Sequence, residues 1–170
     1  LLRFVECAKQ FKIDKVVRIC SDNPFIDINL IEELIYEMKK KPELDYVTHS
    51  LEGTPSMKCH LGIFSELVKF KAIEDECEKN KNLREVEHVT LPIYLNPSKY
   101  RVKFIPYISE INIKNFRLTI DTKEDFENAK KIYNEQQKIN NFSTHQVFTI
   151  LRNNNLIQKS MIKQIKNHSK

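Results

Sequence analysis

Two aspartates stand where the chain turns from a predicted strand into a predicted helix. Asp22 follows the β-branched run Lys15–Cys20 and lies in a Ser-Asp-Asn-Pro turn, and Asp121 follows Phe116–Ile120, whose apolar residues alternate. Open α/β sheets collect their ligands at the carboxyl ends of strands. If the two strands share one parallel sheet, both carboxylates face one crevice. Such a pair suits Mg²⁺, which accepts one or two carboxylates and completes its shell with water and substrate phosphates.

A simpler reading of the same residues is structural. Each aspartate could serve only to cap the helix that follows it. The stretch from Thr122 to Asp125 has the pattern of a capping box, in which a threonine and an acidic residue three positions later satisfy the first helical N–H groups. We therefore expect Thr122 and Asp125 to act as caps rather than as ligands.

The elements that would position these residues alternate along the chain. Strands are expected at residues 15–20, 45–49, 57–64, 101–105 and 116–120. Helices are expected at 1–11, 28–38, 65–80 and 124–139, and two short ones after residue 141 split at Asn153–Asn155. The segment 83–95 is expected to be a helix or an irregular one, because Pro92 would break or kink a helix there. In the helix at 124–139, Phe126, Ala129, Ile132 and Tyr133 share one face. Alternating strands and helices predict an α/β fold with a parallel or mixed sheet and helices on its faces.

The composition is that of a soluble globular protein, and the cytoplasm is the expected location. The 170 residues are 41% hydrophobic and 30% charged, with no signal-peptide pattern and no apolar run long enough to span a membrane. We expect an α/β domain over residues 1–140 and a basic helical extension over 141–170. The four cysteines have no metal-binding spacing and are expected to be free thiols.

The basic extension and the scarcity of glycine limit the possible partners. Lys159, Lys163 and Lys166 have the spacing of the solvated face of an amphipathic helix, and no aromatic residue lies among them, so nucleic-acid binding is not expected. Only two glycines occur, so neither a Walker A motif nor G-x-G-x-x-G can be written. The first residues already have helical spacing with no cap ahead of them, which suggests that further sequence precedes Leu1.

Four stretches resemble the motifs of one enzyme family, in the family's order. Residues 17–27 (VRICSDNPFID) are similar to R-I-x-x-D-x-P-x-I-D and Glu87–Thr90 to E-H-V-T. Tyr94–Arg101 is similar to Y-x-N-P-x-x-Y/F-R and Phe116–Phe126 to L-R-L-T-V-D-T-P-E-D-F. On these motifs the chain, over about residues 1–156, resembles the SpsF-like cytidylyltransferases, relatives of the acylneuraminate and CMP-Kdo synthetases. The resemblance implies a three-layer α/β/α, Rossmann-like nucleotidyltransferase sandwich with a mixed, mostly parallel sheet that lacks its first strand and loop.

The resemblance also implies an activity and a set of site residues. In such enzymes a hydroxyl of an acidic sugar attacks the α-phosphate of CTP, pyrophosphate leaves, and a CMP-sugar for polysaccharide or flagellar glycan synthesis results. Asp22 and Asp121 would be catalytic residues that hold Mg²⁺, and Arg18 would be a third catalytic residue, binding a sugar carboxylate or phosphate unless it forms only a structural ion pair. Glu87, His88 and Asn23 would bind substrate, although His88 could equally be a packing residue. A homodimer is a further expectation.

One family feature is missing. The basic loop R-x-G-S-x-R-x-P-x-K, which grips the triphosphate in the family, matches nothing in this chain, so the chain starting at Leu1 is expected to bind CTP weakly and to supply the metal and acceptor side. The segment Gly53–Gly62 also departs from the family pattern. Two alternatives to an enzyme stay open: a non-catalytic remnant that keeps the fold, and a structural subunit whose partner supplies the loop.

Overall fold

The computed structural model of the chain describes residues 2–79 and 89–168, which form two compact units. Unit 1 takes in residues 2–18, 29–49, 65–79 and 89–105, and unit 2 takes in residues 19–28, 50–64 and 106–168. The domain boundary predicted at residue 140 lies inside unit 2 and not between the two units, and it stays a prediction. Among the described residues, no helix combines the length and the apolar character that crossing a membrane requires.

Unit 1 is built on a sheet whose strands run in both directions. β1 (Lys15–Arg18) is antiparallel to β4 (Glu66–Lys69), which is antiparallel to β2 (Tyr46–Leu51). β5 (Val102–Pro106) also pairs with β2. Residue numbers rise together along these last two strands, since Tyr46 N–H donates to the carbonyl of Arg101 and Tyr107 N–H to that of Ser50, so the pair is parallel. The predicted mixed sheet is confirmed, with more antiparallel neighbours than expected.

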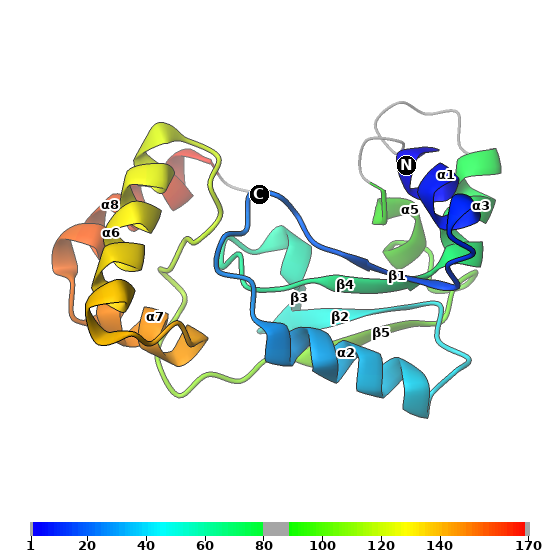
Figure 1. Cartoon of the computed structure of the whole chain (residues 1–170), viewed down its shortest axis with the longest axis horizontal. Helices are drawn as coiled ribbons and strands as arrows, with labels where there is room; N and C mark the ends of the chain where they lie inside the picture. The colour runs from blue at the N-terminus through cyan, green and yellow to red at the C-terminus, as the bar shows by residue number, and fades with distance from the viewer. Residues whose placement is uncertain (1, 80–88, 169–170) are drawn as a thin grey trace. The chain divides into compact units, whose positions relative to one another are not determined.

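Helices cover both faces of this sheet (Figure 1). The amphipathic α2 (Ile28–Lys40) buries Leu34 and Met38 against Val47 and Leu67 of the strands, in the main apolar core. Because side chains alternate along a strand, Tyr46 points to the other face, where its ring meets Tyr94. That face carries α5 (Leu91–Tyr94) and α3 (Phe70–Lys79), and α3 packs on α1 (Leu2–Gln10). The predicted α/β class with three layers is confirmed.

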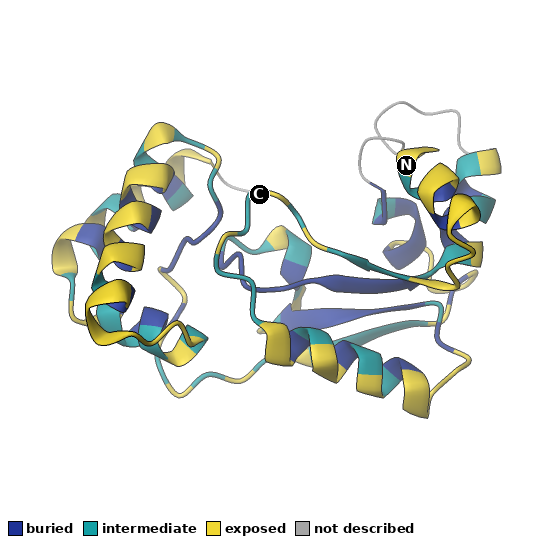
Figure 2. Cartoon of the chain, in the orientation of Figure 1, coloured by how far each residue is buried: buried dark blue, intermediate teal, exposed yellow. Residues whose placement is uncertain are grey.

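Unit 2 is a cluster of three helices with buried irregular chain beside it. α6 (Lys123–Ile139), α7 (Thr144–Arg152) and α8 (Asn155–Asn167) pack on one another (Figure 1). Thr122 caps α6 in a capping box with Asp125, as predicted, and Ser143 and Asn154 cap the next two helices. Figure 2 shows that α6 alternates between buried and exposed residues along its length, as a helix on the surface of a unit does.

The second segment of unit 2 along the chain, residues 50–64, begins with a tight hairpin. The last two residues of β2 pair with β3 (Thr54–Pro55), and a short 3₁₀ turn, η1 (Ser56–Lys58), follows. Glu52 and Gly53, the two residues between the strands, both have positive φ, at 50° and 80°. A two-residue hairpin turn with the natural twist of the strands requires this backbone.

Four sequence predictions are wrong in whole or in part. The segment 65–80, expected to be one helix, begins with strand β4 and is helical only over α3, and no regular strand forms at 57–64. The expected strand Phe116–Ile120 is irregular backbone, because its N–H groups bond to Asp22 and His60 rather than to a neighbouring strand. Phe126 and Tyr133 are about half exposed, since Asn128 and Gln136 join Ala129 and Ile132 on the buried face of α6.

Within the segment expected at 83–95, the described helical part is α5, and Pro92 lies in the first turn of that helix, where its missing N–H is not needed. The expected residues 83–88 of the same helix lie outside the described residues. The four cysteines are free, as predicted.

A glycine lies directly against the irregular segment that precedes Asp121. Gly62 has φ +64°, and a Cβ there would lie 2.8 Å from the backbone of Leu118 and of Thr119. Gly53 also has positive φ, at +80°, but a Cβ there would meet nothing within 4 Å. The two positions therefore separate the cost of the backbone conformation from the cost of crowding.

We expect Gly62→Ala to destabilise the fold much more than Gly53→Ala. Placing an L-residue in the left-handed region costs about 1 kcal/mol at either site. Crowding at Gly62 adds about 2 kcal/mol because the 118–119 backbone must shift. Urea unfolding followed by circular dichroism measures both values. Equal losses in the two variants would show that residues 60–62 do not pack closely on this segment.

Candidate active site

The two aspartates predicted to form the site lie beside each other at the level of the main chain. The N–H of Ile120 donates a 2.8 Å hydrogen bond to the carbonyl oxygen of Asp22, and Asp121 is the next residue. Both aspartates belong to unit 2. The structure therefore brings them together, although through irregular backbone rather than through two parallel strands.

The side chain of Asp22 is not engaged by other parts of the described chain. Asp22 lies in a turn in which the N–H of Asn23 donates to the carbonyl of Cys20, at 3.2 Å. Within residues 2–79 and 89–168, no side chain donates a hydrogen bond to its carboxylate. The amide oxygen Oδ1 of Asn23 is buried and has no hydrogen-bond partner among the same residues. Two adjacent side chains thus offer oxygen acceptors.

Asp121 is held by its neighbours but still reaches solvent. Its Oδ2 accepts hydrogen bonds from Nη2 of Arg117, at 2.6 Å, and from the hydroxyl of Thr119, at 3.1 Å. Its side chain is 39% exposed. The alternative that Asp121 merely caps a helix does not hold, since the cap of α6 is Thr122. One carboxylate oxygen is therefore fixed while the group remains accessible.

Arg117 is the centre of the polar network that fixes Asp121. Its fully buried guanidinium donates to both oxygens of Asp125, from Nε at 2.8 Å and from Nη2 at 3.0 Å. Its Nη1 contacts Nδ1 of His60. A guanidinium can only donate, so Nδ1 of His60 is the acceptor and the ring proton sits on Nε2. The carbonyl of His60 also accepts the N–H of Leu118, at 2.9 Å.

The network changes the acidity of Asp125. Burial alone would raise the pKa of this carboxyl group, but hydrogen bonds from Arg117, Thr122 and the backbone of Asp121 together outweigh burial and lower it. Asp125 is thus charged at neutral pH. It balances Arg117 and leaves Asp121 as the exposed carboxylate of the group.

Arg18 belongs to unit 1, where it ends β1 and forms an ion pair. Its Nη1 contacts Oε2 of Glu66, which is 4% exposed. The structural alternative for Arg18, an ion pair, is therefore present, and binding of a substrate anion stays a prediction. Glu87 and His88, the other predicted substrate residues, lie outside the described residues.

The sequence did not single out four residues that organise these groups. Arg117 and His60 surround the carboxylates of unit 2, and Glu66 and Tyr46 surround Arg18. Arg117 carried no signal of burial, because a charged residue between alternating apolar residues is expected on the solvent side of a strand. Glu66 carried none, because it lay in a segment assigned to a helix.

The donor set at Asp22 and Asp121 fits a hard divalent cation. Mg²⁺ prefers carboxylate oxygens and usually keeps several waters, so two aspartates suffice for a site completed by a phosphate substrate. Over residues 2–79 and 89–168 no group of three or more histidine, cysteine or acidic side chains could form an all-protein site. Mg²⁺ binding at the aspartate pair therefore stays a prediction, consistent with the oxygen donors present.

Comparison with known proteins identifies the family. The family model described as Cytidylyltransferase matches residues 1–148, and the chain belongs to this family. A solved structure titled as a cytidylyltransferase from Leptospira borgpetersenii has a similar fold, with a TM-score of 0.66 at 22% sequence identity. That match covers 98% of this chain and 61% of the other. The fold predicted from the motifs is thereby confirmed.

Curated relatives come from a bacterium and an archaeon. The spore coat polysaccharide biosynthesis protein SpsF of Bacillus subtilis is 29% identical over 153 residues, covering 89% of this chain and 60% of that protein. An uncharacterised protein of Methanocaldococcus jannaschii is 35% identical over 136 residues, covering 80% of this chain and 51% of its own length. The chain thus spans between half and two thirds of the length of these relatives.

Proposed function

We propose that the protein is a cytidylyltransferase that forms a CMP-activated sugar from CTP and an acidic sugar. In this reaction an oxygen of a sugar hydroxyl bonds to the α-phosphorus of CTP, the bond to the β-phosphate oxygen breaks, pyrophosphate leaves, and the hydroxyl proton passes to solvent. This chain supplies the metal and acceptor side of the reaction. The single observation that carries the proposal is the main-chain bond that sets Asp121 beside Asp22.

The proposed roles follow from how each carboxylate is held. Asp22 and Asp121 together would hold Mg²⁺, which, when bound, neutralises phosphate charge. Arg117 fixes one oxygen of Asp121, so the carboxylate keeps its orientation before the substrate arrives. A group that is already oriented need not reorganise during the reaction, and such preorganisation is a large part of catalysis by charged sites.

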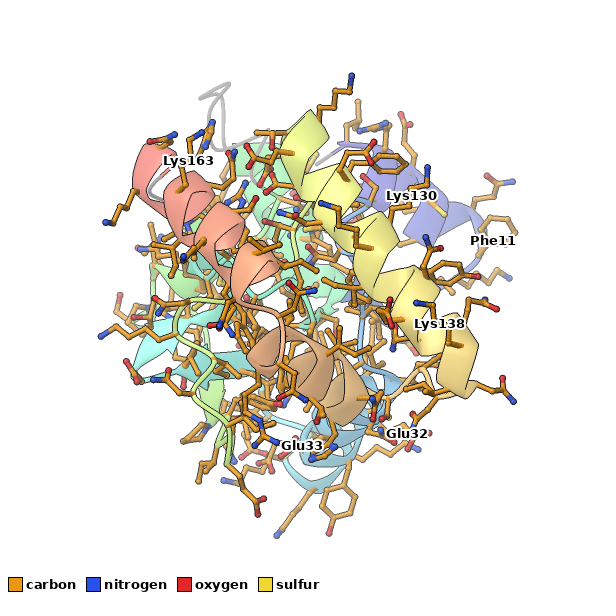
Figure 3. The ribbon with its side chains drawn as sticks, turned by 90° about the vertical axis from the view of Figure 1, so that its left-hand side faces the viewer. Phe11, Glu32, Glu33, Lys130, Lys138 and Lys163 are labelled. Carbon is orange, nitrogen blue, oxygen red and sulfur yellow. The ribbon has the colours of Figure 1, made fainter. Side chains whose placement is uncertain are left out.

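The partners of the protein are proposed on the same basis. CTP and an acidic sugar are the proposed substrates, and SpsF, a relative by sequence, is named for spore coat polysaccharide biosynthesis. A free acidic group on the sugar would meet a cation on the acceptor side, and Arg18 is the proposed residue because a guanidinium binds carboxylates bidentately. The lysines of α8, predicted to form the solvated face of an amphipathic helix, lie on its exposed face, and Figure 3 shows Lys163 there.

Pyrophosphate release tests the proposal directly. The protein, expressed with any coding sequence that continues in frame upstream of Leu1, is incubated with CTP, Mg²⁺ and a panel of acidic and neutral sugars. We expect release with at least one acidic sugar, dependent on Mg²⁺ and on CTP rather than UTP or ATP. A folded protein that releases no pyrophosphate with any sugar would contradict the proposal and favour the non-catalytic alternatives.

A further inference from the structure

Glu66 gathers three hydrogen-bond donors in the interior of unit 1. Its Oε1 accepts the hydroxyl of Tyr46, at 2.5 Å, and the hydroxyl of Thr90, at 2.6 Å, while its Oε2 accepts Nη1 of Arg18. Glu66 lies on β4, Tyr46 on β2, Arg18 at the end of β1, and Thr90 directly before α5. One carboxylate therefore connects three adjacent strands of the sheet with the segment that leads into a helix.

The cluster is dry except at the arginine. Glu66 is 4% exposed, Tyr46 0% and Thr90 3%, whereas the side chain of Arg18 is 21% exposed. Burial, and next the nearby charge of Glu66, raise the pKa of the Tyr46 hydroxyl well above its ordinary value, so it remains a donor. The guanidinium of Arg18 is thus anchored from the inside, and the part of the side chain that water reaches is held in one orientation.

We propose that Glu66 is a positioning residue for the acceptor: it holds the Arg18 guanidinium in place to meet the acidic group of the sugar. The inference rests on the proposed function and extends it to a residue of the sheet interior. Glu66 does not touch the substrate. A fixed guanidinium binds a carboxylate with less loss of side-chain freedom than a mobile one, so removal of the anchor weakens sugar binding.

The chain offers a matched control in the same unit. Glu76 on α3 is also buried, at 7% exposure, and also accepts from a cation and a tyrosine, Lys99 and Tyr100. Its neighbours do not include Arg18. Glu66→Gln and Glu76→Gln each remove one buried negative charge next to a cation, so both are expected to reduce stability to a similar degree.

The anchoring itself can be measured without turnover. In ¹⁵N-resolved NMR spectra of the chain without substrates, a guanidinium held in an ion pair rotates slowly about its Cζ–Nη bonds and gives separate Nη signals. We expect this signature for Arg18 in the wild-type protein and in Glu76→Gln, and its loss in Glu66→Gln. An Arg18 signal that averages equally in all three proteins would overturn the proposal.

The consequence for the substrate is measured by steady-state kinetics. Glu66→Gln is expected to raise KM for the acidic sugar about tenfold and to leave KM for CTP within about twofold. In an Arg18→Met background the same substitution should add less than about twofold, because Glu66 acts through Arg18. Glu76→Gln should change neither KM.

The outcomes separate the two proposals. A wild-type protein without pyrophosphate release contradicts the proposed function, whereas the NMR result still decides whether Glu66 anchors Arg18. A wild-type protein that turns over while Glu66→Gln leaves the sugar KM unchanged, or lowers it, contradicts the inference and leaves the function intact. Additive effects of the Arg18 and Glu66 substitutions would likewise show that Glu66 does not act through Arg18.

Discussion

Replacing Asp22 or Asp121 by asparagine is expected to reduce pyrophosphate release about 100-fold or more. Each change keeps the size of the side chain but removes the negative charge that would hold Mg²⁺ against the phosphates. Losses of 10²–10³ are typical when one preorganised electrostatic contact to a reacting group is removed. The measurement is turnover of CTP and the active acidic sugar at saturating Mg²⁺.

A third aspartate provides the control for this experiment. Asp75 on α3 pairs with Lys71 at 3.1 Å on the surface of unit 1, so Asp75→Asn should leave both turnover and stability nearly unchanged. Unfolding in urea checks that Asp22→Asn and Asp121→Asn remain folded. Turnover in both variants within about threefold of wild type would refute the assignment of the two aspartates as metal ligands.

Removing the guanidinium of Arg117 is expected to produce the largest loss of stability in the chain. Arg117→Met leaves Asp125 buried without its cation, and breaking one side of a buried pair costs about 3–5 kcal/mol. Arg117→Lys should lose less, because the charge remains while the two-point contact with Asp125 is lost. The free energy of unfolding in urea measures both effects.

An exposed ion pair on α6 gives the scale for comparison. Lys138 pairs with Glu135 at 2.6 Å, with both side chains open to solvent, and Figure 3 shows Lys138 on that helix. Lys138→Met should change the free energy of unfolding by less than about 1 kcal/mol. If Arg117→Met falls within the same range, the buried network contributes specificity of conformation rather than stability.

The helices were the most accessible part of the fold from the sequence. The apolar spacing of α2 and α6, and the asparagines that separate α7 from α8, predicted these helices to within a few residues. The capping box of Thr122 and Asp125 was visible as a local pattern and is present. Local signals of this kind succeed because the groups that satisfy each other are close in the chain.

The failures share a different cause, which is pairing over long distances in the sequence. The leucine and valine of β4 fit a helical spacing as well as a strand, and only pairing with β1 and β2 decides between them. The apolar residues of Phe116–Ile120 alternate as in a strand, but N–H groups of this segment bond to the carbonyls of His60 and Asp22 instead of to a neighbouring strand. The partners of Arg117 include His60, which lies 57 residues away.

Local sequence motifs pointed to the two aspartates, but they did not point to the residues that hold them. Both aspartates follow apolar runs and precede helices, and these signals lie within a few residues of each site. The tertiary packing determines that Arg117 and Thr119 fix Asp121. It also determines that no described side chain engages Asp22. The sequence therefore predicted which residues to test but not how they are held.

The link between Ile120 and Asp22 runs through peptide groups alone, so it is independent of which side chains stand at positions 22 and 121. Exchanging those side chains changes the donor atoms, while the backbone still sets the distance between the two Cα atoms. A histidine or glutamate introduced at either position would thus be presented from the same place. If the aspartate pair holds Mg²⁺ as proposed, this loop would be a fixed frame on which the preference among divalent ions can be redesigned without rebuilding the protein around it.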